Sequence, residues 1–489
     1  MPWGKGTSLV LNTFPETYNK FATHKNIYPE GWALNMNQIG RNLAIGNSEK
    51  GIMVKKFKTA RWVFFVMVSI VYMFATFQRI VPSVMGNAIQ ADINISATLW
   101  GTVGLAFTWT YAFAQGPVGT FLDKYGQRMG LSVILILSAI GCLVFGAAHS
   151  SMGIILGRVL VALAISGFMV AGAKTCANWF TTKEYVVVYA IFMGLGNLGS
   201  LLATTPMQLL MNFCGWRHAV IYFVGGVSLL MAVVVALFLR DTPDKMGLQS
   251  PEKILETGIT KSSKVEDKAA VVENISAGEI LRSPIVWICA CIALGSSASG
   301  QTLQSLWIGI YMHTLMPAVP AITISNVLLC ASIGLMLGSI SAGFFTNRYT
   351  LTRTLIGSNV LFLVFWAFMA FNAGNMTVAS LMVTNFFLGF AQMLTVTTNF
   401  MLIRELFPKS RLGTALGFTN TFIWVFGAGL CQQLWGFILD VITKGGAYTI
   451  PAFAACFKFQ LIYIIVATGA AYAVYRMARQ GKITSEHLI

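Results

Sequence analysis

Residues 119–128 read GTFLDKYGQR, and residues 343–353 read GFFTNRYTLTR, a related stretch that begins 224 positions later. A second pair repeats this relation, because residues 194–197 (GLGN) and residues 417–420 (GFTN) lie 223 positions apart. Two separate matches at nearly the same offset indicate that the chain contains two related halves in the same orientation.

The composition shows which solvent surrounds these halves. Of the 489 residues, 56% are hydrophobic and only 10% are charged, whereas about 25% of the residues in an ordinary soluble domain are charged. Stretches of roughly 20 apolar residues recur along the chain, and each can cross a bilayer core of about 30 Å as a helix that satisfies its own backbone polar groups. The sequence therefore predicts an all-α integral membrane protein.

Twelve apolar stretches are expected to span the membrane, six in each half. They lie near residues 62–86, 98–121, 129–148, 152–175, 186–212, 218–239, 285–312, 321–346, 353–373, 377–402, 413–438 and 451–475. The polar segments between them predict an N-terminal tail, a first six-helix bundle, a linker, a second bundle and a C-terminal tail, at residues 1–61, 62–240, 241–284, 285–476 and 477–489. Met53, just before the basic stretch KKFKTARW, is an alternative start that would make the first segment a start-site artefact.

The formal net charge of +16 is distributed over alternate loops. Lysines and arginines in short loops mark the cytoplasmic side of a membrane protein. The side that holds the N-terminus has sixteen of them, and the opposite side has two, Arg217 and Lys444. The sixteen are Lys55, Lys56, Lys58, Arg61, Lys124, Arg128, Lys174, Lys183, Arg348, Arg353, Arg404, Lys409, Arg411, Arg476, Arg479 and Lys482. We therefore expect both termini in the cytoplasm, a multi-pass protein of the cell's inner membrane, and no nucleic-acid partner.

The stretch 119–128 resembles a known family. Its Gly-x-x-x-Asp-Lys-x-Gly-x-Arg pattern between the second and third spans is similar to the loop motif of the major facilitator superfamily. The resemblance covers residues 60–478 and implies twelve transmembrane helices in two pseudo-symmetric six-helix bundles. It also implies a conformational latch that holds the halves together when the protein is open outward, formed by Gly119, Asp123, Lys124, Gly126 and Arg128. The second copy has Asn347 in place of the acid, so no matching latch is expected there.

In that fold, a substrate lies between the halves near the middle of the membrane. Arg79 is the main candidate, because an arginine inside an apolar span usually faces a wet cavity or an anion. The alternative is that its side chain extends along the helix to the outer membrane surface. For the other candidates the alternative is packing between helices or, for Arg158, a gating role. The full set of substrate-binding candidates is Tyr72, Arg79, Tyr111, Gln115, Arg158, Asn197, Gln301, Gln304 and Asn420.

Acidic residues are absent from the middle of every predicted span, although the chain has seventeen aspartates and glutamates. A cavity with an arginine and no carboxylate attracts anions, and a guanidinium can form paired hydrogen bonds with a carboxylate or a phosphate. The sequence also shows no proton carrier inside the membrane. The eight cysteines have no metal-like spacing and mostly lie in apolar segments, so they predict free thiols, no metal site and no cofactor.

Residues 72–82 and 304–309 look like the corresponding spans of bacterial sugar-phosphate and organic-anion permeases of the superfamily. This resemblance implies a monomeric secondary active transporter, embedded in the lipid bilayer, that moves a small organic anion by alternating access. One alternative is an efflux transporter for drugs or other amphipathic compounds. A membrane-embedded enzyme or a sensory receptor is a further alternative, but no pairing of a nucleophile with a base supports an enzyme.

Overall fold

The computed structural model describes residues 31–248, 251, 283–407 and 409–480. In this part of the chain all regular structure is helical. The chain divides into two units, Met1–Ala60 and Arg61–Ile489, and the second contains the bundles of apolar helices. Much of the predicted linker at 241–284, as well as residues 1–30 and 481–489 of the predicted tails, lies outside the described residues.

The helices of the first half are α2 (Gly31–Ile93), α3 (Ala97–Ala147), α4 (Ser151–Trp179), α5 (Thr182–Leu202), α6 (Thr205–His218), η1 (Ala219–Gly225) and α7 (Gly226–Phe238), followed by the short η2 (Pro243–Met246). The helices of the second half are α10 (Pro284–Thr302), η3 (Leu303–Trp307), α11 (Ile308–Leu315), α12 (Ala321–Tyr349), α13 (Leu351–Phe371), α14 (Val378–Leu406), α15 (Lys409–Phe422), η4 (Ile423–Gly429), α16 (Leu430–Thr443) and α17 (Ile450–Arg479).

These elements correspond to twelve membrane spans. Ten helices in the described residues are long and apolar enough to cross a membrane. Two of them, α3 and the run from α6 to α7, each turn sharply at a glycine with a positive φ angle, Gly126 (φ 80°) and Gly215 (φ 76°), where one span ends and the next begins. The helix α5 together with the start of α6 forms the fifth span. The predicted fold of two six-helix bundles is therefore confirmed.

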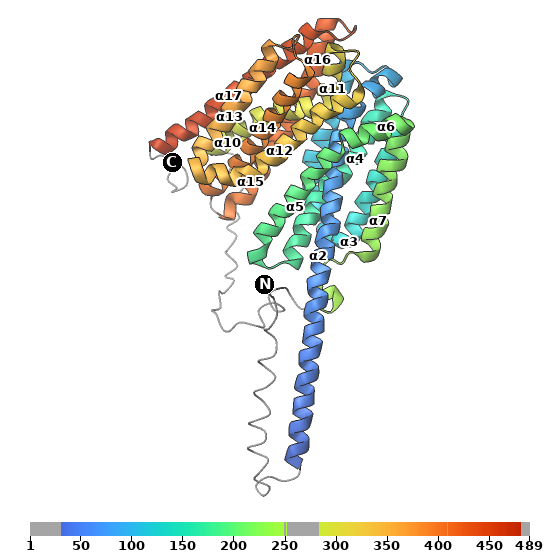
Figure 1. Ribbon diagram of the computed structural model, residues 1–489, viewed down its shortest axis with the longest axis vertical. Helices are drawn as coiled ribbons and strands as arrows, with labels where there is room; N and C mark the ends of the chain where they lie inside the picture. Colours follow the sequence, from blue (N-terminus) through green and yellow to red (C-terminus); the bar gives the residue numbers. More distant parts are fainter. Residues whose placement is uncertain (1–30, 249–250, 252–282, 408, 481–489) are drawn as a thin grey trace, which may run out of the picture. The chain divides into compact units, whose positions relative to one another are not determined.

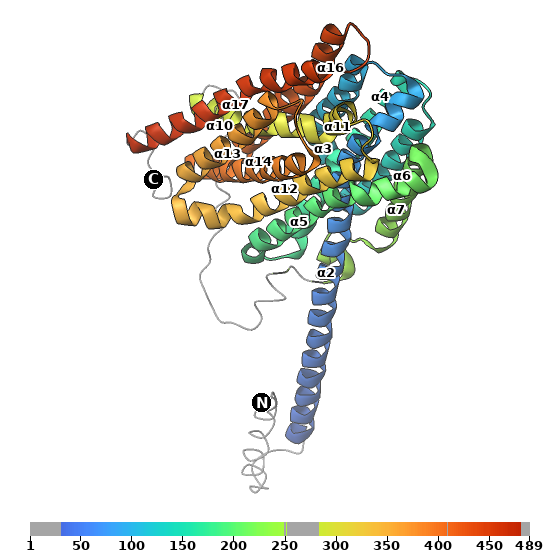
Figure 2. The same cartoon turned by 45° about the horizontal axis from the view of Figure 1, so that its top comes forward.

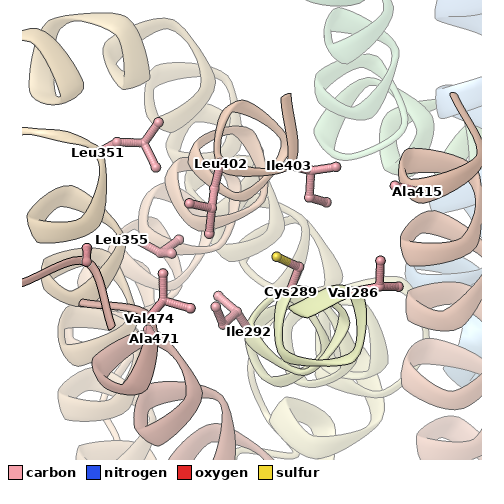
Figure 3. Close-up of a cluster of buried hydrophobic side chains, with 11 residues drawn as sticks. Val286, Cys289, Ile292, Leu351, Leu355, Leu402, Ile403, Ala415, Ala471 and Val474 are labelled. Carbon is pink, nitrogen blue, oxygen red and sulfur yellow. The ribbon is translucent and has the colours of Figure 1, made fainter. Parts of the chain in front are cut away.

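The second half has its own apolar core at one end of its helices. Side chains from α10, α13, α14, α15 and α17 converge on one buried cluster (Figure 3). Its members are Val286, Cys289, Ile292, Leu351, Leu355, Leu402, Ile403, Ala415, Ala471, Val474 and Ala478. Since lipid tails are as apolar as these side chains, close van der Waals packing accounts for the association of the helices.

Most hydrogen bonds between the halves lie on one side, which we call the closed side, and a further one, from Trp109 Nε1 to the Val425 carbonyl (3.0 Å), lies deeper between the halves. In Figure 1 this is the side on which the labels α6, α11 and α16 lie. There α16 packs beside α3 (Figure 2). The donor–acceptor pairs on this side include Asn87–Gly309 (3.1 Å), Gln90–Tyr448 (3.1 Å), Thr98–Asp440 (2.8 Å), Thr102–Gln433 (2.8 Å) and Thr205–Asn326 (2.7 Å). At the other ends of the helices, which carry residues 119–128, the ion pairs Arg61–Glu184 and Lys174–Asp123 each join residues of the first half.

The turn at Gly126 is held by an aspartate that follows the sixth span. The Asp241 carboxylate accepts a hydrogen bond from the backbone amide of Arg128 (2.7 Å) and pairs with Lys245. Burial pushes the pKa of Asp241 upward, but the bonds from Lys245 and from the Arg128 amide outweigh this effect and hold its pKa below the usual value. A carboxylate with a lowered pKa stabilises the fold fully at neutral pH, and this contribution is lost as the pH falls through the lowered pKa.

Replacing Gly126 by alanine should destabilise the protein by about 1 to 2 kcal/mol, because its φ angle of 80° disfavours any residue with a Cβ atom. The new Cβ atom would also lie 2.7 Å from an Asp241 carboxylate oxygen. Thermal unfolding of the purified protein in detergent measures the effect. The control is Gly116→Ala in the same helix, where no atom lies within 4 Å of the added Cβ. Equal melting temperatures for the two variants would contradict this account of the turn.

Candidate functional site

A pocket lies between the two halves. The first half contributes side chains from α2, α3 and α4, and the second half contributes side chains from α10, η3, η4 and α16. The lining residues are Arg79, Val103, Gly104, Phe107, Thr108, Arg158, Gln301, Ser305, Leu306, Trp424 and Gln432. Two arginines thus share a pocket whose described lining contains no acidic side chain.

Arg79 reaches this pocket from α2, in the first span. Its guanidinium lies over the ring of Trp424 in the second half, 5.5 Å from the ring centre. The Arg79 Nε atom is buried and has no hydrogen-bond partner among the described residues. Arg79 therefore faces the space between the halves, with donor groups still available.

Arg158 reaches the same pocket from α4 and is only 6% exposed. Its guanidinium lies 3.9 Å from the centre of the Phe107 ring, and Nη1 donates a hydrogen bond to the backbone oxygen of Gln78 (3.1 Å). Its Nε atom has no partner among the described residues. A buried positive charge without an acidic partner is costly, and bound anions reduce that cost.

Gln78 directly precedes Arg79 in α2, and its side chain connects this helix to two others. Its Nε2 atom donates to Ser228 Oγ of α7 (3.2 Å), and its Oε1 atom accepts from Ser138 Oγ of α3 (2.9 Å). The Arg158 bond to the Gln78 carbonyl adds α4 to the same network. Satisfied buried networks of this kind rigidify their surroundings, so they fix the part of α2 that carries Arg79.

Of the remaining predicted site residues, Gln301 lines the pocket and Tyr111 contacts it through Trp424, with ring centres 5.2 Å apart. Tyr72 stacks on Phe192 of α5 at 4.8 Å. Like Tyr72, the other four predicted residues do not line the pocket. They are Gln115, whose Nε2 atom is buried without a partner, Gln304, which is 4% exposed, and the half-buried Asn197 and Asn420.

Eight lining residues were missed from the sequence, and three of them are polar or aromatic residues of the second half: Ser305, Trp424 and Gln432. Each of these three belongs to, or follows, a segment of π-helix in the second half, η3 or η4. A π-helical turn contains more residues than an α-helical turn, so it rotates the side chains that follow. The polar spacing in the sequence selected Gln304, three residues after Gln301, whereas the pocket contains Ser305, four residues after it.

The predicted latch residues lie away from this pocket, on the side opposite the closed side. Asp123 forms an ion pair with Lys174 of α4, within the same half, and Lys174 also donates to the Gly119 carbonyl (3.1 Å). Lys124 lies 5.3 Å from the centre of the Tyr125 ring. Arg128 donates from Nε to the Ala236 carbonyl (2.6 Å). In this conformation the motif thus ties α3 to α4 and α7.

Known transporters are similar to this chain in sequence. The hexuronate transporter of Escherichia coli (strain K12) is 21% identical over 426 residues, which cover 84% of this chain and 94% of that protein. The glycerol-3-phosphate transporter of Bacillus subtilis (strain 168) is 24% identical over 371 residues, covering 73% of this chain and 81% of that protein.

Solved structures share the fold. A bacterial homolog of the human lysosomal transporter Spinster, solved in an inward-facing and unoccupied conformation, superposes with a TM-score of 0.68 at 15% identity. The match covers 87% of this chain and 99% of that one. The family model of the Major Facilitator Superfamily matches residues 68–430, from the first span to the eleventh. The chain therefore belongs to the Major Facilitator Superfamily.

Proposed function

We propose that this protein is a secondary active transporter that carries a small organic anion across the membrane by alternating access. The observation that carries the proposal is the pair of guanidinium groups, Arg79 and Arg158, in one pocket between the halves without an acidic side chain in its described lining. Guanidinium groups pair with carboxylates and phosphates through charge-assisted hydrogen bonds. An organic anion therefore provides the counter-charge that the lining lacks.

Family membership and the related transporters indicate a carrier rather than an enzyme. Two of these relatives are described as transporters of hexuronate and of glycerol-3-phosphate, which are both anions. We extend only the chemical class to this chain, a hydrophilic molecule with a carboxylate or phosphate. The aromatic rings of Phe107 and Trp424 do not favour a hydrophobic cation, because both already face an arginine.

Alternating access requires that the halves rock about the pocket, so that it opens to one side of the membrane at a time. In this conformation most hydrogen bonds between the halves occupy the closed side. We propose that residues 62–240 and 285–476 are the two moving bundles. The distribution of lysine and arginine in the loops supports a cytoplasmic location for the side with residues 119–128.

The test is uptake by the purified full-length protein in proteoliposomes. Radiolabelled D-glucuronate and glycerol-3-phosphate are the anionic probes, with unlabelled succinate and a hydrophobic cation, tetraphenylphosphonium, as competitors. We expect saturable uptake of at least one anion, inhibited by other anions and not by the cation. Transport of the cation without transport of any anion would instead support the efflux alternative and overturn the proposal.

Replacing Asp123 by asparagine should slow the turnover of transport more than it weakens substrate binding. The change removes the negative charge that pairs with Lys174, more than one helical turn from any pocket residue. Since the pocket itself is unchanged, we expect the maximal uptake rate to fall about tenfold and the substrate concentration at half-maximal rate to change less than about twofold. Initial rates in proteoliposomes over a range of substrate concentrations measure both quantities. An unchanged maximal rate would show that the motif acid does not control the conformational change.

A further inference from the structure

The pocket contains an acceptor as well as donors. Gln432 of α16 is only 2% exposed, lines the pocket, and has an Oε1 atom without a hydrogen-bond partner among the described residues. Buried amide groups in folded proteins nearly always have partners, so an unpaired carbonyl oxygen at the edge of a binding pocket points to a ligand. The two arginines of the pocket can only donate hydrogen bonds. They therefore explain only how an anionic group of the substrate is recognised.

The orientation of the Gln432 amide follows from its neighbour Ser305. The Ser305 hydroxyl donates its proton to the backbone carbonyl of Gln301. The Ser305 Oγ atom can then only accept a further hydrogen bond, and it accepts one from Gln432 Nε2 (2.9 Å). A flipped amide would place two acceptor oxygens against each other. The Gln432 Oε1 atom must therefore point away from Ser305, toward Gly104 of the first half.

Gly104 leaves the space in which this oxygen lies. A Cβ atom at Gly104 would be 2.1 Å from Gln432 Oε1 and 2.9 Å from the Leu306 side chain. Both glycine and glutamine belong to the lining of the pocket. Gly104 itself thus offers no side chain to satisfy the oxygen, which leaves the oxygen open to a group bound in the pocket.

We propose that Gln432 Oε1 accepts a hydrogen bond from a hydroxyl group of the substrate and makes the transporter selective for hydroxylated organic anions. This inference rests on the proposed function, because it assumes that an anion binds between Arg79 and Arg158. An anion without hydroxyl groups would displace water from the pocket and leave the carbonyl unpaired. A site built to bond a hydroxyl group rejects an analogue that lacks it for this reason.

The experiment compares anions that match in carbon number and charge but differ in hydroxyl groups. D-Gluconate is paired with hexanoate, and D-glucarate with adipate. Apparent affinities come from the thermal stabilisation of the purified full-length protein in detergent. We expect the wild-type protein to bind the hydroxylated member of at least one pair about tenfold or more tightly. In Gln432→Leu this preference should fall to about twofold or less.

A ratio of affinities does not depend on the fraction of protein that is folded, so a purely structural role of Gln432 would leave the preference intact. Gln432→Met provides a second apolar side chain in case the leucine variant does not fold. The matched control is Gln208→Leu, which removes the glutamine 224 positions earlier, a buried residue outside the pocket lining. This variant should keep the wild-type preference.

The inference would be overturned if the wild-type protein bound both members of each pair equally, or if both Gln432 variants kept the preference. Either result would leave the proposed function standing, since anions would still bind. If no anion of either kind bound to the wild-type protein, both the inference and the proposed function would fail.

Discussion

Arg79→Ala should lower anion uptake in proteoliposomes by about a hundredfold or more, while the protein still inserts and folds. The guanidinium faces the pocket between the halves, and its Nε atom has no partner among the described residues, so the substitution removes a donor without leaving an acceptor unpaired. A pair of charge-assisted hydrogen bonds to a carboxylate stabilises a complex by roughly 3 kcal/mol, which corresponds to about two orders of magnitude in affinity. Uptake at limiting substrate concentration measures this loss.

Two further variants distinguish the loss of the positive charge from the loss of the planar guanidinium, and the loss of this arginine from the loss of any arginine. Arg79→Lys keeps the positive charge but loses the planar fork, and we expect it to restore only part of the uptake. Arg240→Ala is the control for the loss of an arginine, because Arg240 lies after the sixth span and donates to the carbonyls of Leu237 and Leu239 rather than to the pocket. Wild-type uptake in Arg79→Ala would exclude this arginine from the binding of the substrate.

The architecture could be predicted from the sequence because its signals are strong and repeated. An apolar stretch long enough for a membrane appears twelve times, and the motif at residues 119–128 has a weaker copy 224 residues later. Arg79 stood out for a related reason, since a charged residue within an apolar span is rare and costly. The structure places it beside Trp424 of the other half, a contact that no spacing within one span could have predicted.

The rest of the pocket depends on departures from α-helical geometry. The π-helical segment Leu303–Trp307 brings Ser305 to the pocket, whereas the polar spacing in the sequence had favoured Gln304. The segment Ile423–Gly429 has the same effect before Gln432. The sequence of such a segment has no distinctive composition, because tertiary packing compensates for the lost helical hydrogen bonds. Only coordinates show where the side chains that follow it point.

The conformational state could not be predicted either. The motif identified Asp123 as part of a latch between the halves, but in this conformation Asp123 pairs with Lys174 of its own half. A carrier populates at least two conformations with the same sequence, so contacts that form in only one of them cannot be assigned from the sequence. The role of Asp123 in the other conformation stays a prediction.

Gly436→Leu should prevent the closed side from forming and should lower the uptake by about a hundredfold. Gly436 of α16 packs against the backbone of α3, where a Cβ atom would lie 2.3 Å from the Ala97 carbonyl oxygen and 2.9 Å from the Cα atom of Thr98. Backbone atoms within helices cannot move aside individually, so the leucine has to separate the two helices. The separation would also break the bonds from the Ala97 and Thr98 amides to the Asp440 carboxylate, at 3.2 and 2.8 Å.

Spin labels on both sides of this contact provide a direct measurement. Ala91 and Ala447 are exposed and lie next to Gln90 and Tyr448, which are bonded to each other across the halves. With cysteines introduced at these two positions in a cysteine-free background, the distance between the labels should increase by several Å in Gly436→Leu, roughly the width of the added side chain.

The control is Gly469→Leu in α17, where no atom lies within 4 Å of an added Cβ atom, and its distance distribution should match that of the unsubstituted protein. A Gly436→Leu variant with the same distance distribution as this control would show that α3 and α16 tolerate the extra volume. The close packing of these helices would then not limit alternating access. A longer distance with normal uptake would show instead that the closed side need not form fully during transport, because the cycle would continue without it.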